Sequence, residues 1–238
     1  MLMRHCLTAC VLLFSSVQLS AAQECVVLLH GLGRVSNSMG ELERKMGRAG
    51  FDAVNINYPS RREESEVLAA DAVGRGISQC QQQGAATIHF VTHSLGGILL
   101  RVYLQDHDLP QLGRVVMLGP PNHGSEIVDN LIAVPGFGFV VGPTGRRLGT
   151  DGESLPAELG PADFELGIIA GDLNLNPLGF LFFAEANDTI VSVASTELEG
   201  MDDHIVLPVT HSLMMRDNEV IDHAIHFLKT GNFIPQPE

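Results

Sequence analysis

The chain has 238 residues, of which 45% are hydrophobic and 18% charged, and its formal net charge is −14. This length suits one substantial core and leaves little room for a second domain. The acidic balance argues against nucleic-acid binding, which needs a basic surface, and against attraction to anionic lipid headgroups. The acidic residues are scattered along the chain, so we interpret them as a solvated surface.

The first segment, residues 1–22, is typical of an export signal. It has a polar start at Arg4 and His5, an apolar middle over 7–17 and a small-residue cleavage site at Ser20-Ala21-Ala22. The sequence Leu7-Thr8-Ala9-Cys10 is similar to a lipoprotein cleavage box, but it comes before the apolar stretch instead of after it. We therefore expect cleavage after Ala22, a single domain over 23–238, and a periplasmic or secreted protein.

Two cysteines remain after such cleavage, Cys25 and Cys80. An even pair in an oxidising compartment favours one disulfide. Cys25 opens the first predicted strand, and Cys80 ends the predicted helix that precedes the third. Both would lie at the same end of the sheet, so we predict a Cys25–Cys80 disulfide there.

Apolar runs and helical patterns alternate along the rest of the chain. The predicted strands cover 25–29, 51–58, 88–91, 114–118, 164–170 and 203–209, and the predicted helices cover 36–48, 62–82, 98–104 and 213–228. Strands that are apolar throughout suit a parallel sheet that is buried on both faces. We therefore predict an α/β fold of about six mainly parallel strands with helices on both faces. Only the Pro-rich tail, 235–238, is expected to be disordered.

The segment 126–161 interrupts this alternation. Its middle, 131–142, is apolar and rich in glycine, without a long clean period. A cap over a substrate pocket is one interpretation, because loops above the carboxyl ends of strands form such pockets. Packing against the edge of the sheet is the other, and the sequence leaves both open.

The stretch Thr92-His93-Ser94-Leu95-Gly96 lies between a predicted strand and a predicted helix. This small-x-Ser-x-Gly pattern is typical of the sharp turn that presents a nucleophilic serine above a sheet. Residues two before and two after the serine need to be small, because strand and helix pass close together there. Gly96 meets this demand, whereas Thr92 is larger and stiffer than the usual glycine or alanine.

A serine hydroxyl needs a base to take its proton and a carboxylate to orient that base. In folds with this turn the partners follow in the order serine, acid, histidine, each at the carboxyl end of a strand. His211 comes directly after the last predicted strand, and Asp188 lies in the loop before it. Asp172, at the end of the fifth strand, is the alternative acid. We predict Ser94, Asp188 and His211 as the catalytic residues.

The negative charge that develops on the substrate oxygen needs two hydrogen-bond donors. The backbone N–H of Leu95, directly after the serine, supplies one. The N–H of Leu32, within His30-Gly31-Leu32-Gly33 at the end of the first strand, is the predicted second.

These motifs carry a family resemblance. The blocks concerned are Val27-Leu28-Leu29-His30-Gly31-Leu32, Asn55-Ile56-Asn57-Tyr58-Pro59-Ser60-Arg61, Thr92-His93-Ser94-Leu95-Gly96-Gly97, Pro120-Pro121-Asn122-His123-Gly124-Ser125, Asn187-Asp188-Thr189-Ile190-Val191-Ser192-Val193, and His211. The chain after residue 22 resembles bacterial triacylglycerol lipases and esterases of the α/β-hydrolase family over almost all its length. The resemblance implies hydrolysis of acyl esters through an acyl-enzyme, with Ser94 as nucleophile, His211 as acid and base, and Asp188 as its orienting partner.

Two departures from the family pattern stand out. Thr92 replaces the usual small residue, and the predicted sheet starts at the strand with the oxyanion loop, without the family's leading antiparallel strands. This would be a minimal version of the fold. Nothing in the sequence indicates a metal site or requires a cofactor.

The expected substrate is a small-molecule or lipid acyl ester, with transient contact to a lipid surface as a further expectation. A thioesterase or amidase with the same three residues is the alternative activity. A catalytically inactive hydrolase scaffold that serves as a binding protein is the alternative from another class.

Overall fold

The computed structural model of the protein describes residues 23–176 and 183–236. The predicted export signal therefore lies outside the described residues, as do 237–238 of the predicted disordered tail. Within the described ranges, six strands form one sheet in the order β2-β1-β3-β4-β5-β6, with every neighbouring pair parallel. The strands are β1 Glu24–Leu29, β2 Asp52–Ile56, β3 Thr87–His93, β4 Leu112–Leu118, β5 Leu166–Gly171 and β6 Asp203–Leu207. The predicted α/β architecture is confirmed.

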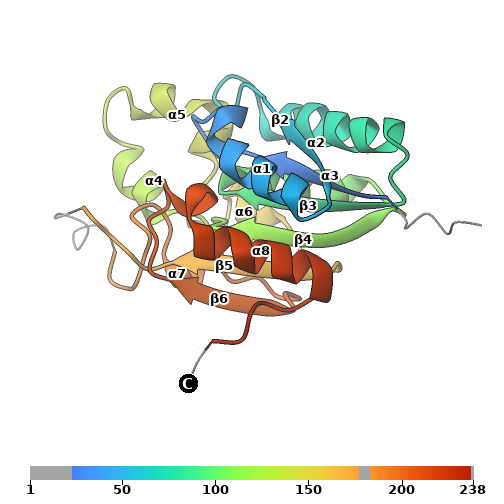
Figure 1. Cartoon of the computed structure of the whole chain (residues 1–238). Coiled ribbons are helices and arrows are strands. Elements are labelled where there is room, and N and C mark those ends of the chain that lie inside the picture. Colours follow the sequence, from blue (N-terminus) through green and yellow to red (C-terminus); the bar gives the residue numbers. More distant parts are fainter. Residues whose placement is uncertain (1–22, 177–182, 237–238) are drawn as a thin grey trace, which may run out of the picture.

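Helices cover both faces of this sheet (Figure 1). The α-helices are α1 Gly40–Arg48, α2 Ser65–Gln82, α3 Leu95–Asp106, α4 Glu126–Leu131, α5 Phe137–Arg146, α6 Leu155–Glu158, α7 Val193–Thr196 and α8 Asn218–Thr230, with 3-10 turns η1 Ser36–Met39 and η3 Met214–Arg216. Alternate residues of β1 face opposite cores, as the two-residue period of a strand requires. Val27 and Leu29 pack in the core with α2 and α3, and Val26 and Leu28 in the core with α1 and α8. Figure 1 shows α1 and α8 together in front of the sheet.

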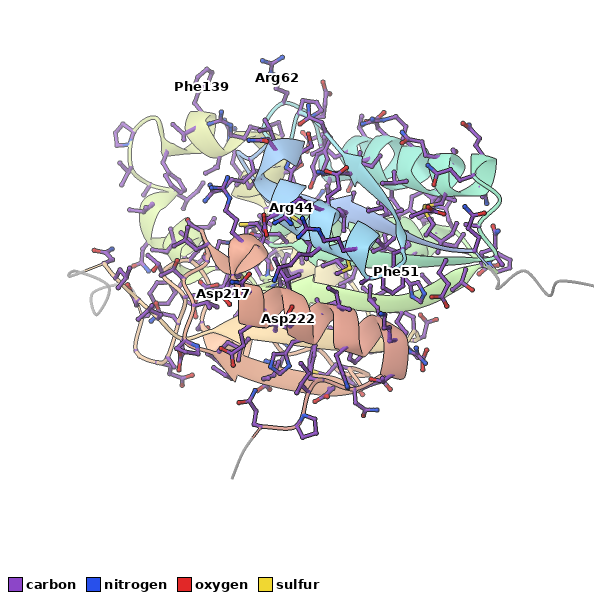
Figure 2. All side chains as sticks on the ribbon, viewed as in Figure 1. Arg44, Phe51, Arg62, Phe139, Asp217 and Asp222 are labelled. Carbon is purple, nitrogen blue, oxygen red and sulfur yellow. A yellow bond between two sulfur atoms is a disulfide. The ribbon has the colours of Figure 1, made fainter. Side chains whose placement is uncertain are left out.

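The predicted helix over 213–228 is wrong at its start. The chain makes the short turn η3 first, and α8 begins at Asn218. The cause is Asp217, whose Oδ1 accepts hydrogen bonds from the N–H groups of Glu219 at 2.9 Å and Val220 at 3.2 Å. Such an N-cap satisfies donors that have no acceptor within the helix. Figure 2 shows Asp217 at this end of α8.

Other boundaries shift by a few residues. The predicted strand 51–58 ends at Ile56, and the predicted helix 62–82 begins at Ser65. Between them the chain turns at Pro59, where the Arg62 N–H donates to the Pro59 carbonyl oxygen at 2.9 Å. This turn carries Tyr58 and Ser60 toward the end of β1, where both support the site described below.

The predicted Cys25–Cys80 disulfide is present. It joins the start of β1 to the last turn of α2, and both cysteines are fully buried. The bond closes a loop across 55 positions of sequence. It therefore ties α2 to the sheet at the end opposite Ser94.

No helix among the described residues is long and apolar enough to cross a membrane.

Candidate active site

Ser94 occupies the turn between β3 and α3. Its backbone has φ 53° and ψ −121°, and Thr189 is the one other non-glycine residue with positive φ in the described ranges. Such a conformation strains a residue that has a side chain, and it persists only where surrounding structure enforces it. Here the Ser94 N–H donates to the Leu118 carbonyl oxygen of the neighbouring strand at 2.9 Å, which holds the turn against the sheet.

The small residues around Ser94 have distinct packing reasons. A Cβ on Gly96 would lie 2.6 Å from the Leu29 carbonyl oxygen, so strand and helix approach as closely as the motif predicts. Thr92 is accommodated because Gly97 faces it: a Cβ on Gly97 would lie 3.2 Å from Thr92 Oγ1. The position that departs from the family pattern is therefore compensated on the helix. The presence of threonine at position 92 leaves its Oγ1 fully buried without a hydrogen-bond partner.

Asp188 and His211 form a buried pair. His211 Nδ1 lies 2.6 Å from Asp188 Oδ2, and the Asp188 side chain is fully shielded from solvent. The His211 N–H also donates to the Asp188 carbonyl oxygen at 2.9 Å, so backbone and side chain are held together. The alternative acid, Asp172, is exposed, and its N–H bonds to β6 instead. The geometry therefore brings together the acid and the histidine that the sequence favoured.

The turn after Asp188 orients its carboxylate. Asp188 Oδ1 accepts hydrogen bonds from the N–H groups of Ile190 at 3.0 Å and Val191 at 2.8 Å, which leaves Oδ2 for His211. Thr189 adopts its positive φ, 96°, within this turn. Oδ2 is thereby fixed as an acceptor for an imidazole N–H.

The glycine that follows β4 sits against the same pair. A Cβ on Gly119 would lie 3.0 Å from Asp188 Oδ2 and 3.1 Å from His211 Nδ1. Gly119 has φ +53°, a conformation that side chains disfavour. Sequence reasoning did not single out this residue. Its only sequence signal was its position in a Gly-Pro loop directly after a buried strand.

Ser94 and His211 line one pocket at the carboxyl ends of the strands. No hydrogen bond joins the Ser94 hydroxyl to His211, although both residues are described. Hydrogen bonds between catalytic groups are often long or poorly aligned without substrate and tighten in the Michaelis complex. The arrangement thus has the three side chains that general-base activation requires, with the serine hydroxyl free to turn.

Of the two predicted oxyanion residues, Leu32 lines this pocket, and Leu95 directly follows the pocket residue Ser94. Leu95 is the first residue of α3, so its N–H has no acceptor within the helix. Leu32 lines the pocket beside Ser94. The Leu32 loop is held in shape by the Gly33 N–H, which donates to Ser60 Oγ at 2.9 Å, and by the Arg34 N–H, which donates to the Gly31 carbonyl oxygen at 3.2 Å.

His30 supports this loop from below, a role that sequence reasoning missed. Its Nε2 accepts from the Tyr58 N–H at 3.3 Å, so Nδ1 carries the proton and donates to the Gly31 carbonyl oxygen at 2.9 Å. The two rings stack at 4.0 Å, and the Tyr58 hydroxyl donates back to the His30 carbonyl oxygen. Burial lowers the pKa of His30, and burial also raises the pKa of Tyr58. Both rings are therefore neutral structural supports.

His93, next to Ser94, is a second support. Its Nε2 donates to the His211 carbonyl oxygen at 2.9 Å, and the two rings lie 4.8 Å apart, centre to centre. Burial, with a smaller contribution from the charge of His211, lowers the pKa of His93 well below its ordinary value. A neutral His93 fits its environment, because its Nδ1 is buried without a partner. His93 therefore connects β3 to the backbone of the loop that contains His211.

The pocket has a volume of about 240 Å³. Its wall is mostly apolar, and the segment 126–161 contributes Ile127, Val128, Phe137, Val141 and Leu148 to it. Residues of 126–161 thus line the pocket, and the cap interpretation of this segment stays a prediction. On the outer surface, Phe139 of α5 is 87% exposed, and Figure 2 shows its side chain pointing away from the body.

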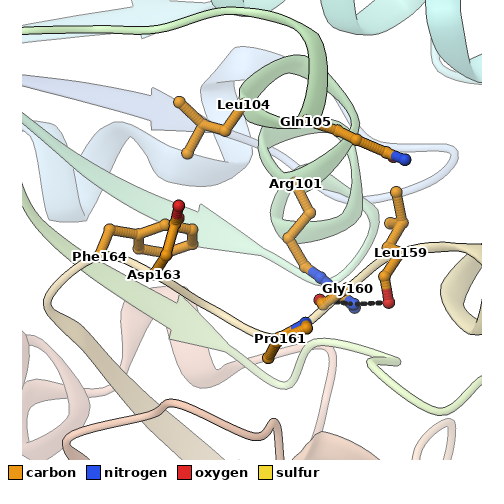
Figure 3. A pocket seen from close by; sticks show the side chains of 8 residues that line it. All are labelled: Arg101, Leu104, Gln105, Leu159, Gly160, Pro161, Asp163 and Phe164. Atoms are coloured by element: carbon orange, nitrogen blue, oxygen red, sulfur yellow. Dashed lines mark hydrogen bonds between the residues drawn. The ribbon is translucent and has the colours of Figure 1, made fainter.

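Another cavity, of about 330 Å³, lies beside α3 and is lined by none of the predicted catalytic residues. Figure 3 shows Arg101 reaching across it from α3. The guanidinium donates to the carbonyl oxygens of Leu159 and Gly160, both at 3.0 Å, and to Asn122 Oδ1 at 3.0 Å. Burial lowers the pKa of Arg101 to about 10. Because carbonyl groups take up its donors, Arg101 fastens the helix behind Ser94 to two loops.

The six-stranded parallel sheet, the strained turn after β3 and the crossing helices define the α/β-hydrolase fold, and the resemblance stated from the sequence is confirmed at the level of the fold. The sequence matches no family model. It also matches no curated protein. The likeness is one of structure.

Several solved lipases and esterases share this fold. The mature form of lipase BlEst2 from Bacillus licheniformis is 19% identical, with a TM-score of 0.65 over 90% of this chain and 94% of that one. Its propeptide form gives 19% identity and a TM-score of 0.67 over 84% of this chain, which spans about half (48%) of that longer one. Phospholipase PlaB from Legionella pneumophila is 18% identical, with a TM-score of 0.60 over 89% of this chain and 57% of the PlaB chain.

Proposed function

We propose that the protein is an exported serine hydrolase that cleaves carboxylic esters through an acyl-enzyme. One observation carries the proposal: His211, paired with the buried Asp188 at 2.6 Å, lines the same pocket as Ser94, which is held in a strained turn. A fully buried carboxylate and a strained backbone each cost stability, and active sites are where such costs are typically found. The predicted export signal and the Cys25–Cys80 disulfide support the extracytoplasmic setting.

In the proposed reaction, His211 Nε2 accepts the hydroxyl proton as Ser94 Oγ forms a bond to the ester carbonyl carbon. Asp188 holds the Nδ1 proton and stabilises the resulting imidazolium. The N–H groups of Leu95 and Leu32 donate to the carbonyl oxygen, which carries the negative charge. The bond from carbonyl carbon to alcohol oxygen then breaks, and His211 returns the proton to the departing alcohol. Water repeats the sequence on the acyl-enzyme and releases the acid.

The apolar wall of the pocket fits an acyl chain. Its volume of about 240 Å³ is below the roughly 300–1,000 Å³ of typical ligand pockets. We therefore infer a preference for short and medium acyl chains over long ones. The lipases and esterases among the similar structures support esters as the substrate class.

The test is hydrolysis of p-nitrophenyl esters with acyl chains from two to sixteen carbons. The native protein is expected to prefer the short and medium members, and Ser94→Ala is expected to lower kcat by a factor on the order of 10⁵–10⁶ while remaining folded. Ester hydrolysis that survives Ser94→Ala would refute the proposal. Absence of ester turnover together with cleavage of acyl thioesters or amides would assign the alternative activity.

A further inference from the structure

A second pocket adjoins the catalytic pocket. It has a volume of about 360 Å³ and lies between the loop after β1, at Gly33 to Val35, and the turn at Asn57 to Arg62. Arg34 lines both pockets, so the two share this side chain as part of their walls. In contrast to the apolar catalytic pocket, this wall is rich in polar groups. The proposed function assigns it no role.

Arg34 is held beside the loop that contains His211, and both residues line the catalytic pocket. Its Nη2 donates to Ser212 Oγ at 2.8 Å, and Ser212 directly follows His211. The Arg34 residue is half-buried. His211 is the group that protonates the departing alcohol in the proposed reaction. A negatively charged group on the alcohol part of a substrate would therefore lie near the Arg34 guanidinium.

Arg61 brings a second cation to the same place. It folds over Gly33, where a Cβ added to the glycine would lie 3.6 Å from Arg61 Cδ and 4.0 Å from Cζ. Arg34 and Arg61 thus flank one glycine of the oxyanion loop. Arg62 lines the pocket as well, but Figure 2 shows its side chain pointing away from the body.

Neither cation is neutralised by the protein. No ion pair of Arg34 or Arg61 occurs within the described residues, and no aspartate or glutamate lines either pocket. Glu63 and Glu64 follow in the sequence, but they are exposed and form no ion pair with these arginines. This contrasts with the chain as a whole, which has 28 acidic residues against 14 lysines and arginines. Two cations that line one pocket without a counterion favour an anionic ligand.

We propose that this second pocket binds an anionic group, a carboxylate or a phosphate, on the alcohol part of the ester substrate. Arg34 and Arg61 contact the anion while the acyl chain occupies the apolar pocket. The assignment rests on the proposed function, because it places the anion relative to Ser94 and His211. Planar guanidinium groups suit both anions, since they can donate two parallel hydrogen bonds to either.

The test uses butyrate esters of three phenols that differ in one meta substituent: a carboxamide, a carboxylate or a phosphate. The quantity measured is kcat/KM for each charged ester divided by kcat/KM for the amide ester. The native chain, Arg34→Gln and Arg61→Gln are compared. Lys229→Gln is the matched control, because it removes the same charge at the end of the sheet near Phe51, away from the site. Comparing variants with the native chain cancels the different leaving abilities of the phenols.

We expect the ratio to fall about tenfold in Arg34→Gln and several-fold in Arg61→Gln, since charged hydrogen bonds are the stronger class. Lys229→Gln should leave it unchanged. The charged ester whose ratio falls more in the arginine variants, relative to the native chain, identifies the anion. Equal ratios in the native chain and both arginine variants, or an equal fall in Lys229→Gln, would overturn the proposal.

A binding measurement separates this result from failure of the proposed function. Calorimetric titration with 3-hydroxyphenyl phosphate and with 3-hydroxybenzoate requires no catalysis. Weaker binding to Arg34→Gln than to the native chain and Lys229→Gln would support the anion site even if none of the esters were hydrolysed. Equal binding to all three proteins would overturn it.

Discussion

Replacement of Thr92 by valine should stabilise the protein. Thr92 is fully buried two residues before Ser94, and its Oγ1 has no hydrogen-bond partner. In the unfolded chain this hydroxyl is hydrated, so folding leaves its desolvation uncompensated. The penalty for an unsatisfied buried polar group is about 1–3 kcal/mol. Valine has nearly the same shape and removes the polar atom, and the missing side chain of Gly97 leaves the neighbouring space that a methyl group needs.

We expect Thr92→Val to raise the free energy of unfolding by about 1–2 kcal/mol. For a domain of this size, that corresponds to a Tm increase of roughly 3–6 °C. Thr144→Val is the matched control, because Thr144 is also fully buried but its Oγ1 donates to the Glu63 carbonyl oxygen at 2.8 Å. Loss of that bond should lower the free energy of unfolding by about 1 kcal/mol.

The assay is urea-induced unfolding with the disulfide intact, followed by circular dichroism, with thermal melts as a second measure. The two threonine variants should change stability in opposite directions with similar denaturant slopes. A Thr92→Val variant that is destabilised as much as Thr144→Val would show that the Thr92 hydroxyl is satisfied in solution, and the packing account of this turn would be refuted.

Asp188→Asn should lower kcat by on the order of 10⁴, because an amide cannot hold the Nδ1 proton of the imidazole in place. Asp172→Asn should have little effect on kcat. The reverse pattern in steady-state kinetics would move the acid to Asp172. The double variant Cys25→Ser, Cys80→Ser should lose about 2–5 kcal/mol of unfolding free energy in denaturant titrations. It should retain esterase activity, since the disulfide lies at the end of the sheet opposite Ser94. Loss of kcat without loss of stability would contradict this prediction. The lowered pKa of His93 means that unfolding takes up a proton below the ordinary histidine pKa. The contribution of neutral His93 to the free energy of unfolding is therefore complete above about pH 6.5 and is lost as the pH falls, by up to roughly 1.4 kcal/mol per pH unit. His93→Gln should flatten the measured pH dependence of the free energy of unfolding. An unchanged slope would show that His93 is charged in the folded protein.

The sheet could be predicted from sequence because its strands are apolar throughout. Buried runs such as β1 and β5 have no other reasonable location in a chain of this charge. Element ends were harder, since they depend on single side chains. Asp217 moves the start of α8 by competing successfully for two backbone donors, a choice that hydrophobic periodicity does not encode.

In the candidate site, too, some residues could be predicted from the sequence and others could not. The proximity of Asp188 to His211 and of His211 to Ser94 could be predicted, because each residue follows a strand in a known order, whereas their catalytic roles stay predictions. Their supports could not be predicted, since the partners are remote in sequence. His30 contacts Tyr58 across 28 positions, and His93 contacts the His211 backbone across 118. The compensation of Thr92 by Gly97 was equally hidden, because it depends on which face of α3 meets the turn.

The most direct measurement of the central claim is the residue that an active-site-directed fluorophosphonate modifies, mapped by peptide mass spectrometry. The native protein is expected to be modified at Ser94 and at no other residue. His211→Gln, which removes the base, should react far more slowly, with its fold verified by circular dichroism. Modification of a different serine, or equal labelling of Ser94 with and without His211, would contradict the claim that the buried Asp188–His211 pair activates this hydroxyl.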